Sequence, residues 1–170
     1  MILKKNLIFL GMMGSGKSTI GFLVSKKLNL DFIDIDIEIE NRAGMKIHEI
    51  FNKKGENYFR SLEEKITLKF LKVGNIVIAL GGGAFINSKI RKQILTNHTS
   101  FFLDVDIETL INRIKGNKKR PLAFKSTNQE IKDLQKKRSR IYQKAQFRVD
   151  CTKLTKSEIV KNIIEIYASK

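Results

Sequence analysis

Residues 11–18 read GMMGSGKS, which matches the pattern G-x-x-x-x-G-K-[ST]. The apolar run Leu7–Leu10 precedes this pattern, and the helix-length amphipathic stretch Ser18–Leu28 follows it. A strand, a glycine-rich loop and a helix in this order turn consecutive backbone N–H groups toward an anion, at the positive end of the helix dipole. We therefore expect residues 11–18, the phosphate loop, to bind a nucleoside triphosphate in an α/β fold.

The residue types in the phosphate loop predict separate roles. Lys17 is expected to bridge the β- and γ-phosphates, and the Ser18 hydroxyl is expected to ligate Mg²⁺. The predicted nucleotide contacts of this segment are Gly14, Ser15, Gly16, Lys17, Ser18 and Thr19. The pattern does not name the phosphate acceptor, because GTPases, ATPases, nucleotide kinases and metabolite kinases share it.

Strand-length and helix-length segments alternate along the rest of the chain. The apolar runs of strand length are Leu7–Leu10, Phe32–Ile35, Ile76–Leu80, Phe101–Val105 and a weaker one at Phe147–Cys151. The amphipathic stretches between them are Ser18–Leu28, Tyr58–Val73, Ser88–Leu95, Ile107–Lys115, Gln129–Lys144 and Lys156–Ala168. Continuous apolar runs are typical of strands buried on both faces of a parallel sheet. Alternation of the two kinds predicts right-handed crossovers, with ligands beyond the carboxyl ends of the strands.

Composition bounds the class of protein. The 170 residues, 42% of them hydrophobic, suit one domain with one core. The N-terminal apolar run is too short for a membrane span, so we expect no membrane partner. The single cysteine, Cys151, favours a reducing compartment, and we expect a cytoplasmic location. The net charge of +16 is mostly lysine spread along the chain, which indicates background composition rather than a specific nucleic-acid partner.

Two carboxylates follow the second apolar run. Alternation along a strand would place Asp34 and Asp36 on one face, next to the strand of the phosphate loop. One carboxylate could then hold Mg²⁺, while the other accepts a proton or hydrogen bond from the acceptor hydroxyl. The alternative is structural, because Asp36 precedes the helix-like stretch Ile37–Ala43 and aspartate favours helix N-caps.

Arg60 and the glycines at 81–83 are further candidates. Arg60 stands at the predicted start of a helix, where its charge opposes the helix dipole, so a carboxylate-binding role is a better explanation than propensity. Glu63, one turn later, could hold it; the alternative is a solvated i,i+3 pair. Gly81, Gly82 and Gly83 suit a close approach of a ligand to the backbone, with a plain tight turn as the alternative.

Two cationic segments come last. The polar segment Lys115–Lys125 suits a flap over the phosphates, from which Arg120 would supply charge to the transition state; an ordinary solvated loop is the alternative. Residues 136–140 read KKRSR on a predicted helix. Most of such a charged face is expected to be solvated, and one of its arginines is a candidate for the cleft.

With these residues collected, the chain resembles the shikimate kinase family over nearly all of its length. The resemblance rests on GMMGSGKST at 11–19, DID at 34–36, FRSLE at 59–63, GGG at 81–83, RPL at 120–122 and RSRIY at 138–142. It implies a single domain over 1–170 with a three-layer αβα P-loop fold, a five-stranded parallel sheet and a mobile lid at about 113–126. A shikimate-binding helical region is implied at about 36–63.

The implied activity is ATP-dependent phosphorylation of the 3-hydroxyl of shikimate, in aromatic amino acid biosynthesis. We expect a monomer, because no exposed apolar stripe in the sequence requires a dimer. Asp36 would bind the substrate hydroxyls and Arg60 and Arg138 its carboxylate, while the backbone at Gly81–Gly83 would touch the ring. The implied catalytic residues are Lys17, Asp36 and Arg120.

On the nucleotide side, the resemblance implies that Asp34 holds Mg²⁺ through water and that Arg113 stacks on adenine. Arg120 would act from the lid, and the loop at 152–155 would close the other side of the adenine. Two rival functions stay open. One is a kinase of another small acceptor, such as gluconate or a nucleoside monophosphate. The other is a non-catalytic P-loop protein that binds nucleic acid through its positive charge.

Overall fold

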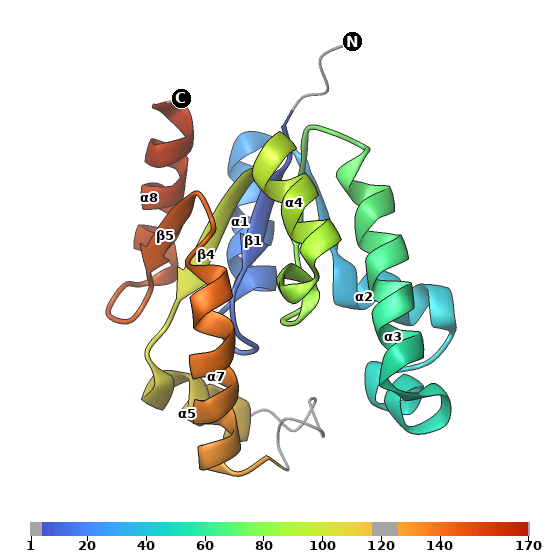
Figure 1. Cartoon of the computed structure of the whole chain (residues 1–170). Coiled ribbons are helices and arrows are strands. Elements are labelled where there is room, and N and C mark those ends of the chain that lie inside the picture. The colour runs from blue at the N-terminus through green and yellow to red at the C-terminus, as the bar shows by residue number, and fades with distance from the viewer. Residues whose placement is uncertain (1–4, 117–125, 170) are drawn as a thin grey trace.

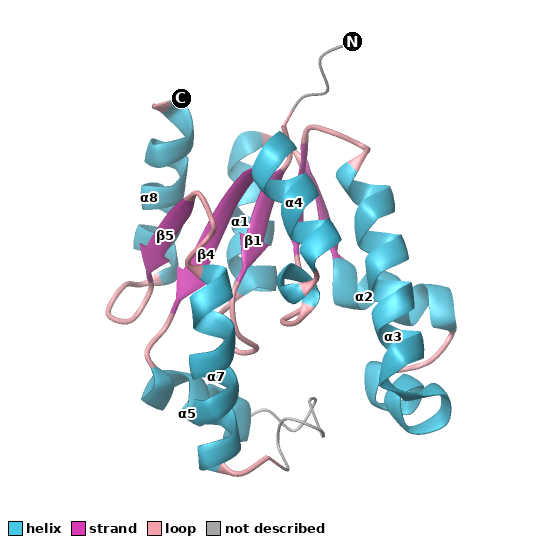
Figure 2. Ribbon diagram, in the orientation of Figure 1, coloured by secondary structure: helices cyan, strands magenta, loops and turns pink. Residues whose placement is uncertain are grey.

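The computed structural model describes residues 5–116 and 126–169. In these ranges the strands are β1 (Leu7–Leu10), β2 (Asp31–Asp34), β3 (Ile76–Ala79), β4 (Thr99–Asp104) and β5 (Phe147–Asp150). They form one five-stranded sheet in the order β2-β3-β1-β4-β5, and every neighbouring pair is parallel (Figure 2). The predicted parallel sheet is confirmed.

Helices cover both faces of this sheet. They are α1 (Lys17–Leu28), α2 (Ile35–Ala43), α3 (Ile47–Leu71), α4 (Ser88–Asn97), α5 (Ile107–Lys115), α7 (Asn128–Tyr142) and α8 (Lys156–Ala168), with a short 3₁₀ turn, η1 (Ala84–Ile86). α1 and α8 lie together behind the sheet in Figure 1, α4 lies in front of it, and α7 lies beside α5 beyond the carboxyl ends of the strands. The three-layer αβα arrangement expected for the P-loop fold is therefore present.

The core follows from this double coverage. β1 and β3 are buried along their whole lengths, as continuous apolar runs in a parallel sheet require. Phe9, Phe101 and Phe147 stand at one level of three neighbouring strands. Their rings stack with centroid separations of 5.6 Å and 5.2 Å. This aromatic row ties β1, β4 and β5 together beneath the carboxyl ends of the strands.

The phosphate loop lies at the point where the strand order reverses, so that later strands are added on the other side of β1. From β1 the chain crosses through α1 to β2 at one edge, and after β3 it continues to β4 and β5 on the other side of β1. The loop after β1 therefore opens between the carboxyl ends of β3 and β4. This is the position at which open α/β sheets bind their ligands.

Two expectations about the first half of the chain are wrong. β2 ends at Asp34 and α2 begins at Ile35, so Asp36 lies in the first turn of a helix rather than on a strand with Asp34. β2 pairs with β3 and not with the strand of the phosphate loop. Helix α3 begins at Ile47, far before the predicted Tyr58, and is interrupted by a kink at Gly55 with φ 82°.

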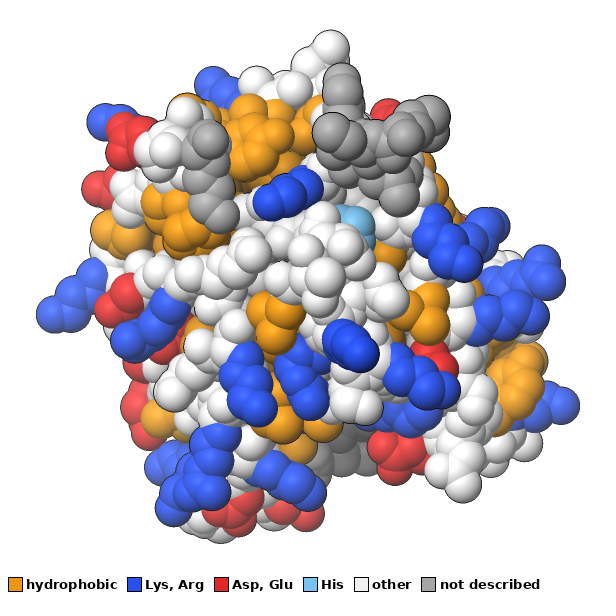
Figure 3. All heavy atoms as spheres, turned by 45° about the horizontal axis from the view of Figure 1, so that its top comes forward, with side chains coloured by type: hydrophobic (Ala, Val, Ile, Leu, Met, Phe, Trp, Pro, Cys, Tyr) orange, Lys and Arg blue, Asp and Glu red, His pale blue; other side chains and the backbone are white. Residues whose placement is uncertain are grey.

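The surface charge is dispersed. Lys and Arg side chains are scattered over the face shown in Figure 3, with uncharged and apolar surface between them. In the described part of the chain, every helix is too short or too polar to cross a bilayer.

Candidate active site

The helix that follows the phosphate loop, α1, has no side-chain N-cap. Gly14 and Gly16 have φ values of 80° and 94°, which favour glycine, and α1 starts directly afterwards at Lys17. Among the described residues, no side chain caps this helix and its first turn holds no acidic residue. Its first N–H groups and its dipole are therefore directed toward the loop, where an anion would complete them.

Lys17 lies folded over this loop. Its ammonium group donates hydrogen bonds to the carbonyl oxygens of Gly11 at 3.0 Å and Met12 at 2.8 Å, and only 7% of the residue is exposed. These hydrogen bonds place the ammonium group next to the helix N-terminus. The arrangement supplies one positive charge and a row of N–H donors at a single anion-binding position.

Ser18 and Asp34 meet beside the same helix end. The Ser18 hydroxyl donates to Asp34 Oδ2 at 2.5 Å, while Asp34 Oδ1 accepts from the backbone N–H groups of Asp36 at 3.0 Å and Ile37 at 3.4 Å. The helix N-cap is therefore Asp34 and not Asp36, which corrects the structural alternative considered for Asp36. Asp34 therefore has two roles: its Oδ1 caps helix α2, and its Oδ2 accepts from Ser18.

The pair fits a magnesium ion chemically. A hydroxyl and a carboxylate are hard oxygen donors, and Mg²⁺ is bound by few protein ligands together with water and substrate phosphates. Within residues 5–116 and 126–169, no group of three or more histidine, cysteine, aspartate or glutamate side chains is placed to hold a metal without such help.

Charged side chains from three helices converge on Gly81, Gly82 and Gly83, the triple glycine. A Cβ atom placed on Gly81 would lie 2.6 Å from Asp36 Oδ1 and 2.7 Å from Glu63 Oε1. On Gly83 it would lie 2.4 Å from Arg60 Nη1, and on Gly82 it would lie 3.3 Å from Arg138 Nη1. The triple glycine therefore leaves room for these side chains.

Glycine is needed at 81–83 for a different reason than in the phosphate loop. None of the three residues has a positive φ. Glycine is required here by the crowding of side chains from α2, α3 and α7. The predicted acceptor contacts Asp36, Arg60 and Arg138 are therefore brought to one place, together with Glu63.

Glu63 holds Arg60 inside this cluster. Arg60 Nη1 donates to Glu63 Oε2 at 2.7 Å, and the Glu63 side chain is 3% exposed. Burial raises the pKa of Glu63, and the neighbouring charges of Arg60 and Arg138 counteract that rise, whereas Asp36 adds to it. Burial disfavours the charged form of Arg60, yet the charge and hydrogen bond of Glu63 raise its pKa on balance. The guanidinium therefore stays ionised.

The second carboxylate oxygen of Glu63, Oε1, differs from the first in its surroundings. Among the described residues, Oε1 is buried without a hydrogen-bond partner. It faces Gly81 on the same side as Asp36. Oε1 is therefore a buried acceptor beside Gly81.

The nucleotide side extends from the phosphate loop toward α5. Arg113 Nη1 donates to the carbonyl oxygen of Gly14 at 3.1 Å, so Arg113 lies against the loop from α5. Thr152 Oγ1 accepts the N–H of Asp106, which caps α5, so the loop at 152–155 begins near the same helix. Arg120 lies outside the described residues, as does most of the predicted lid at 113–126.

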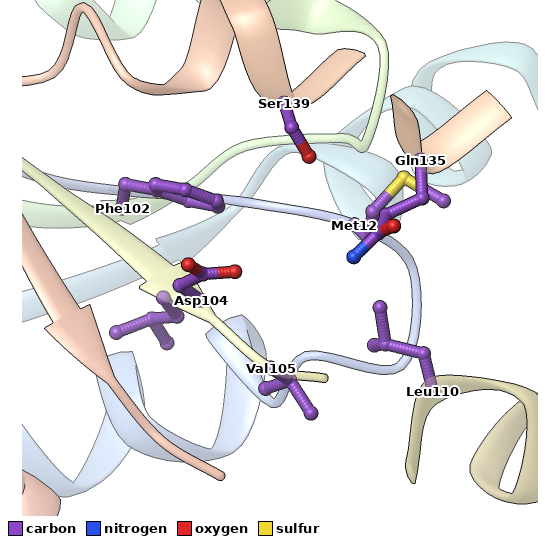
Figure 4. Close-up of a pocket in the computed structure, with 8 residues that line it drawn as sticks. Met12, Phe102, Asp104, Val105, Leu110, Gln135 and Ser139 are labelled. Carbon is purple, nitrogen blue, oxygen red and sulfur yellow. The ribbon is translucent and has the colours of Figure 1, made fainter. Parts of the chain in front are cut away.

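A hollow on the other side of the phosphate loop is not the acceptor site. Figure 4 shows it between β4 and α7, lined by Met12, Phe102, Leu103, Asp104, Val105, Leu110, Gln135 and Ser139. It has essentially no room for a water molecule. None of the charged side chains around the triple glycine lines it, so neither its size nor its chemistry suits a small acid.

One residue of this region received no role from the sequence. The hydroxyl of Tyr142 donates to the carbonyl oxygen of Gly82, and the residue is 1% exposed. A tyrosine at the end of an amphipathic helix is usually a core residue, and the spacing gives no signal for this contact. Only the tertiary structure brings the end of α7 against the triple glycine.

Comparison with known proteins gives a consistent result. The family model described as shikimate kinase matches residues 13–168. A shikimate kinase of Persephonella marina is 42% identical over 160 residues, which cover 94% of this chain and 97% of the relative. One of Aquifex aeolicus is 41% identical over 155 residues, with 91% of each chain covered.

Solved structures agree with the sequence comparison. A shikimate kinase from Acinetobacter baumannii in complex with shikimate superposes with a TM-score of 0.91 at 28% identity, covering 98% of this chain and 94% of that one. The enzyme from Aquifex aeolicus gives a TM-score of 0.83 at 36% identity, covering 96% of both chains. A deoxyadenosine kinase from M. mycoides, at 20% identity and a TM-score of 0.71, shares the fold. The sequence match over nearly the whole chain therefore shows that this chain belongs to the shikimate kinase family.

Proposed function

We propose that the cleft of this chain has two halves, a nucleotide half at the phosphate loop and an acid-binding half at the triple glycine. The reaction is transfer of the γ-phosphate of ATP to the 3-hydroxyl of shikimate, which gives shikimate 3-phosphate and ADP. The observation that carries the assignment of the halves is the convergence of Asp36, Arg60 and Arg138 on Gly81–Gly83. These side chains match the chemistry of a small hydroxylated acid.

In the acid-binding half, the guanidinium groups of Arg60 and Arg138 take the substrate carboxylate. Guanidinium groups recognise carboxylates through paired hydrogen bonds, and Glu63 holds Arg60 in place through the 2.7 Å contact. Asp36 takes the ring hydroxyls, including the one that is phosphorylated. The backbone of the triple glycine, which carries no side chain, lets the ring approach closely.

In the nucleotide half, the loop amides and Lys17 bind the phosphates. We assign these contacts to Gly14, Ser15, Gly16, Lys17, Ser18 and Thr19. Ser18 and Asp34 would hold Mg²⁺, with Asp34 acting through a water molecule. When bound, the ion screens the charge of the β- and γ-phosphates.

The remaining assignments concern the rim of the cleft. Arg113 lies against the phosphate loop and stacks on the adenine. Arg120 is assigned from the sequence alone, as the lid residue that neutralises charge on the transferred group. The lid covers about 113–126, and the helical region at about 36–63 carries the acid-binding residues Asp36 and Arg60.

Phosphoryl transfer depends mainly on how the two substrates are positioned. The 3-hydroxyl oxygen forms a bond to the γ-phosphorus as the bond to the departing ADP oxygen breaks, and the hydroxyl proton leaves along its hydrogen bond to Asp36. Holding both substrates in line makes the step effectively unimolecular. The positive charge of Lys17 and the helix N-terminus stabilises the charge that develops on the transferred group.

The chain is assigned to the cytoplasm and to a monomeric state on two observations. Its single cysteine, Cys151, is buried and unpaired, which suits a reducing compartment. The large apolar side chains that are exposed in the described residues come from several elements and form no single stripe. They are Phe22, Leu23, Ile37, Tyr58 and Val73.

An acceptor panel tests the proposed function. ADP release is measured with shikimate, gluconate, AMP and CMP as separate acceptors, at fixed MgATP. Only shikimate should stimulate release. Faster release with gluconate or a nucleoside monophosphate would assign the cleft to another small acceptor. Absence of stimulation by all four, together with salt-sensitive binding of DNA or RNA, would favour the non-catalytic rival.

A further inference from the structure

Tyr142 joins the two sides of the acid-binding half. It is the last residue of α7, and its hydroxyl donates to the carbonyl oxygen of Gly82 at the middle of the triple glycine. Its ring packs against Phe102 of β4 with centroids 5.3 Å apart. The contact thus links a helix end to a glycine backbone 60 residues away in the sequence.

Arg138 meets the same glycine. It stands one turn before Tyr142 on α7. A Cβ atom placed on Gly82 would lie 3.3 Å from Arg138 Nη1, and the Tyr142 hydroxyl donates to the carbonyl oxygen of that same glycine. Tyr142 therefore ties the part of α7 that carries Arg138 to Gly82.

The phenol keeps its proton throughout this arrangement. Burial raises the pKa of Tyr142 to about 12, and Arg138 offsets part of that rise. The group is therefore a neutral hydroxyl at every physiological pH. It therefore remains a hydrogen-bond donor to Gly82.

The packing around α7 leaves little freedom for this link. Met12 and Phe102 both contact Tyr142, and both line the hollow of Figure 4 together with Ser139. The hollow has essentially no room for water, and Tyr142 at the end of α7 contacts Phe102 of β4 and Met12 of the phosphate loop beside it. A shift of the helix would have to break these contacts.

We propose that Tyr142 is a positioning residue for shikimate, which fixes the guanidinium of Arg138 relative to the triple glycine and thereby sets the geometry of the carboxylate clamp. This inference rests on the proposed function, in which Arg138 binds the carboxylate. Tyr142 itself does not touch the substrate. A purely structural tyrosine would need only its ring, because the ring supplies the packing on Phe102.

Tyr142→Phe separates the hydroxyl from the ring. The KM for shikimate should rise about three- to tenfold, the range expected for one lost hydrogen bond, while the KM for ATP changes less than about twofold. Tyr167→Phe on α8 is the matched control and should change neither. A lower melting temperature for Tyr142→Phe with both KM values normal would overturn the inference and leave the residue a structural one.

A double-mutant cycle with Arg138→Lys tests whether Tyr142 acts through the arginine. Arg138→Lys should raise the KM for shikimate, and Tyr142→Phe should then add less than about a further twofold. Full additivity would overturn the inference. An unchanged KM in Arg138→Lys would overturn the clamp itself, and with it this inference. A raised KM in Arg138→Lys combined with a normal one in Tyr142→Phe would overturn the inference alone.

Discussion

Gly83→Ala should disable the acid-binding half without unfolding the protein. Gly83 has φ −99° and ψ −14°, which alanine adopts without strain. Its new Cβ would lie 2.4 Å from Arg60 Nη1, 2.8 Å from Cζ and 2.9 Å from Nη2. The guanidinium is the flexible end of its side chain, so it moves away and the backbone stays.

The size of the effect follows from the contact that is lost. The displaced guanidinium gives up its 2.7 Å hydrogen bond to Glu63, and a hydrogen bond between charged groups contributes about 1.5–3 kcal/mol. With a factor of ten for each 1.4 kcal/mol, kcat/KM for shikimate should fall about tenfold to hundredfold. The melting temperature should drop by about 3–12 °C, since the same loss of about 1.5–3 kcal/mol falls on the folded protein and each kcal/mol is worth about 2–4 °C in a chain of this size.

The assay follows ADP release with shikimate varied at saturating ATP, and then with ATP varied at saturating shikimate. The defect should appear mainly in the first series. Gly82→Ala is the graded control, because its Cβ would lie 3.3 Å from Arg138 Nη1 and the next neighbour, Met13 N, is 3.6 Å away. It should have the smaller effect. Normal shikimate kinetics in Gly83→Ala, or a larger defect in Gly82→Ala, would refute the crowding argument.

Three further variants test other parts of the account. Asp36→Asn should lower kcat far more than it raises the KM for ATP, and near-normal turnover would remove Asp36 from catalysis. Asp34→Asn should raise the Mg²⁺ concentration needed for half-maximal rate but keep the helix cap, so a Mg²⁺ titration and a thermal melt should diverge; parallel losses would contradict separate roles. His98 accepts the N–H of Asn6, and burial followed by the charge of Lys5 lowers its pKa below 6.5. The unfolded chain then binds the proton more readily, so stability present above about pH 6.5 is lost as the pH falls, and His98→Gln should flatten that dependence in denaturant melts.

The sequence located all five strands and placed the helix after β2 to within two residues of its start. The apolar runs of β1, β3 and β4 are the clearest, because these strands are buried on both faces, whereas β2 and β5 lie at the edges of the sheet and are partly exposed. Residues 33–40 read IDIDIEIE, an alternation typical of a strand. Despite this alternation, α2 begins at Ile35, two residues before the expected helix-like stretch Ile37–Ala43, with Ile35 and Ile39 buried one turn apart and Ile37 55% exposed.

The reason for this helix is a local contact that periodicity does not report. Asp34 Oδ1 accepts two backbone N–H groups and so ends the strand and starts α2. Asp36 reaches the triple glycine from the first turn of that helix. The proposed role of Asp36 is unchanged, although the geometric argument for it was wrong.

Arg60 gives a similar result. Its position at a helix start was the argument for a binding role, yet α3 begins at Ile47 and Arg60 lies beyond the kink at Gly55. What sets Arg60 apart is the buried Glu63 and the space above Gly83. Both depend on how α3 packs against the end of β3, which spacing in the sequence does not encode.

The most direct test of the account is a crystal structure of the chain with shikimate and ADP bound. The carboxylate of shikimate should lie between the guanidinium groups of Arg60 and Arg138, with its oxygens about 3 Å from donors of both. A carboxylate bound elsewhere, out of reach of both arginines, would contradict the central claim that the triple glycine and its surrounding charges form the acid-binding half.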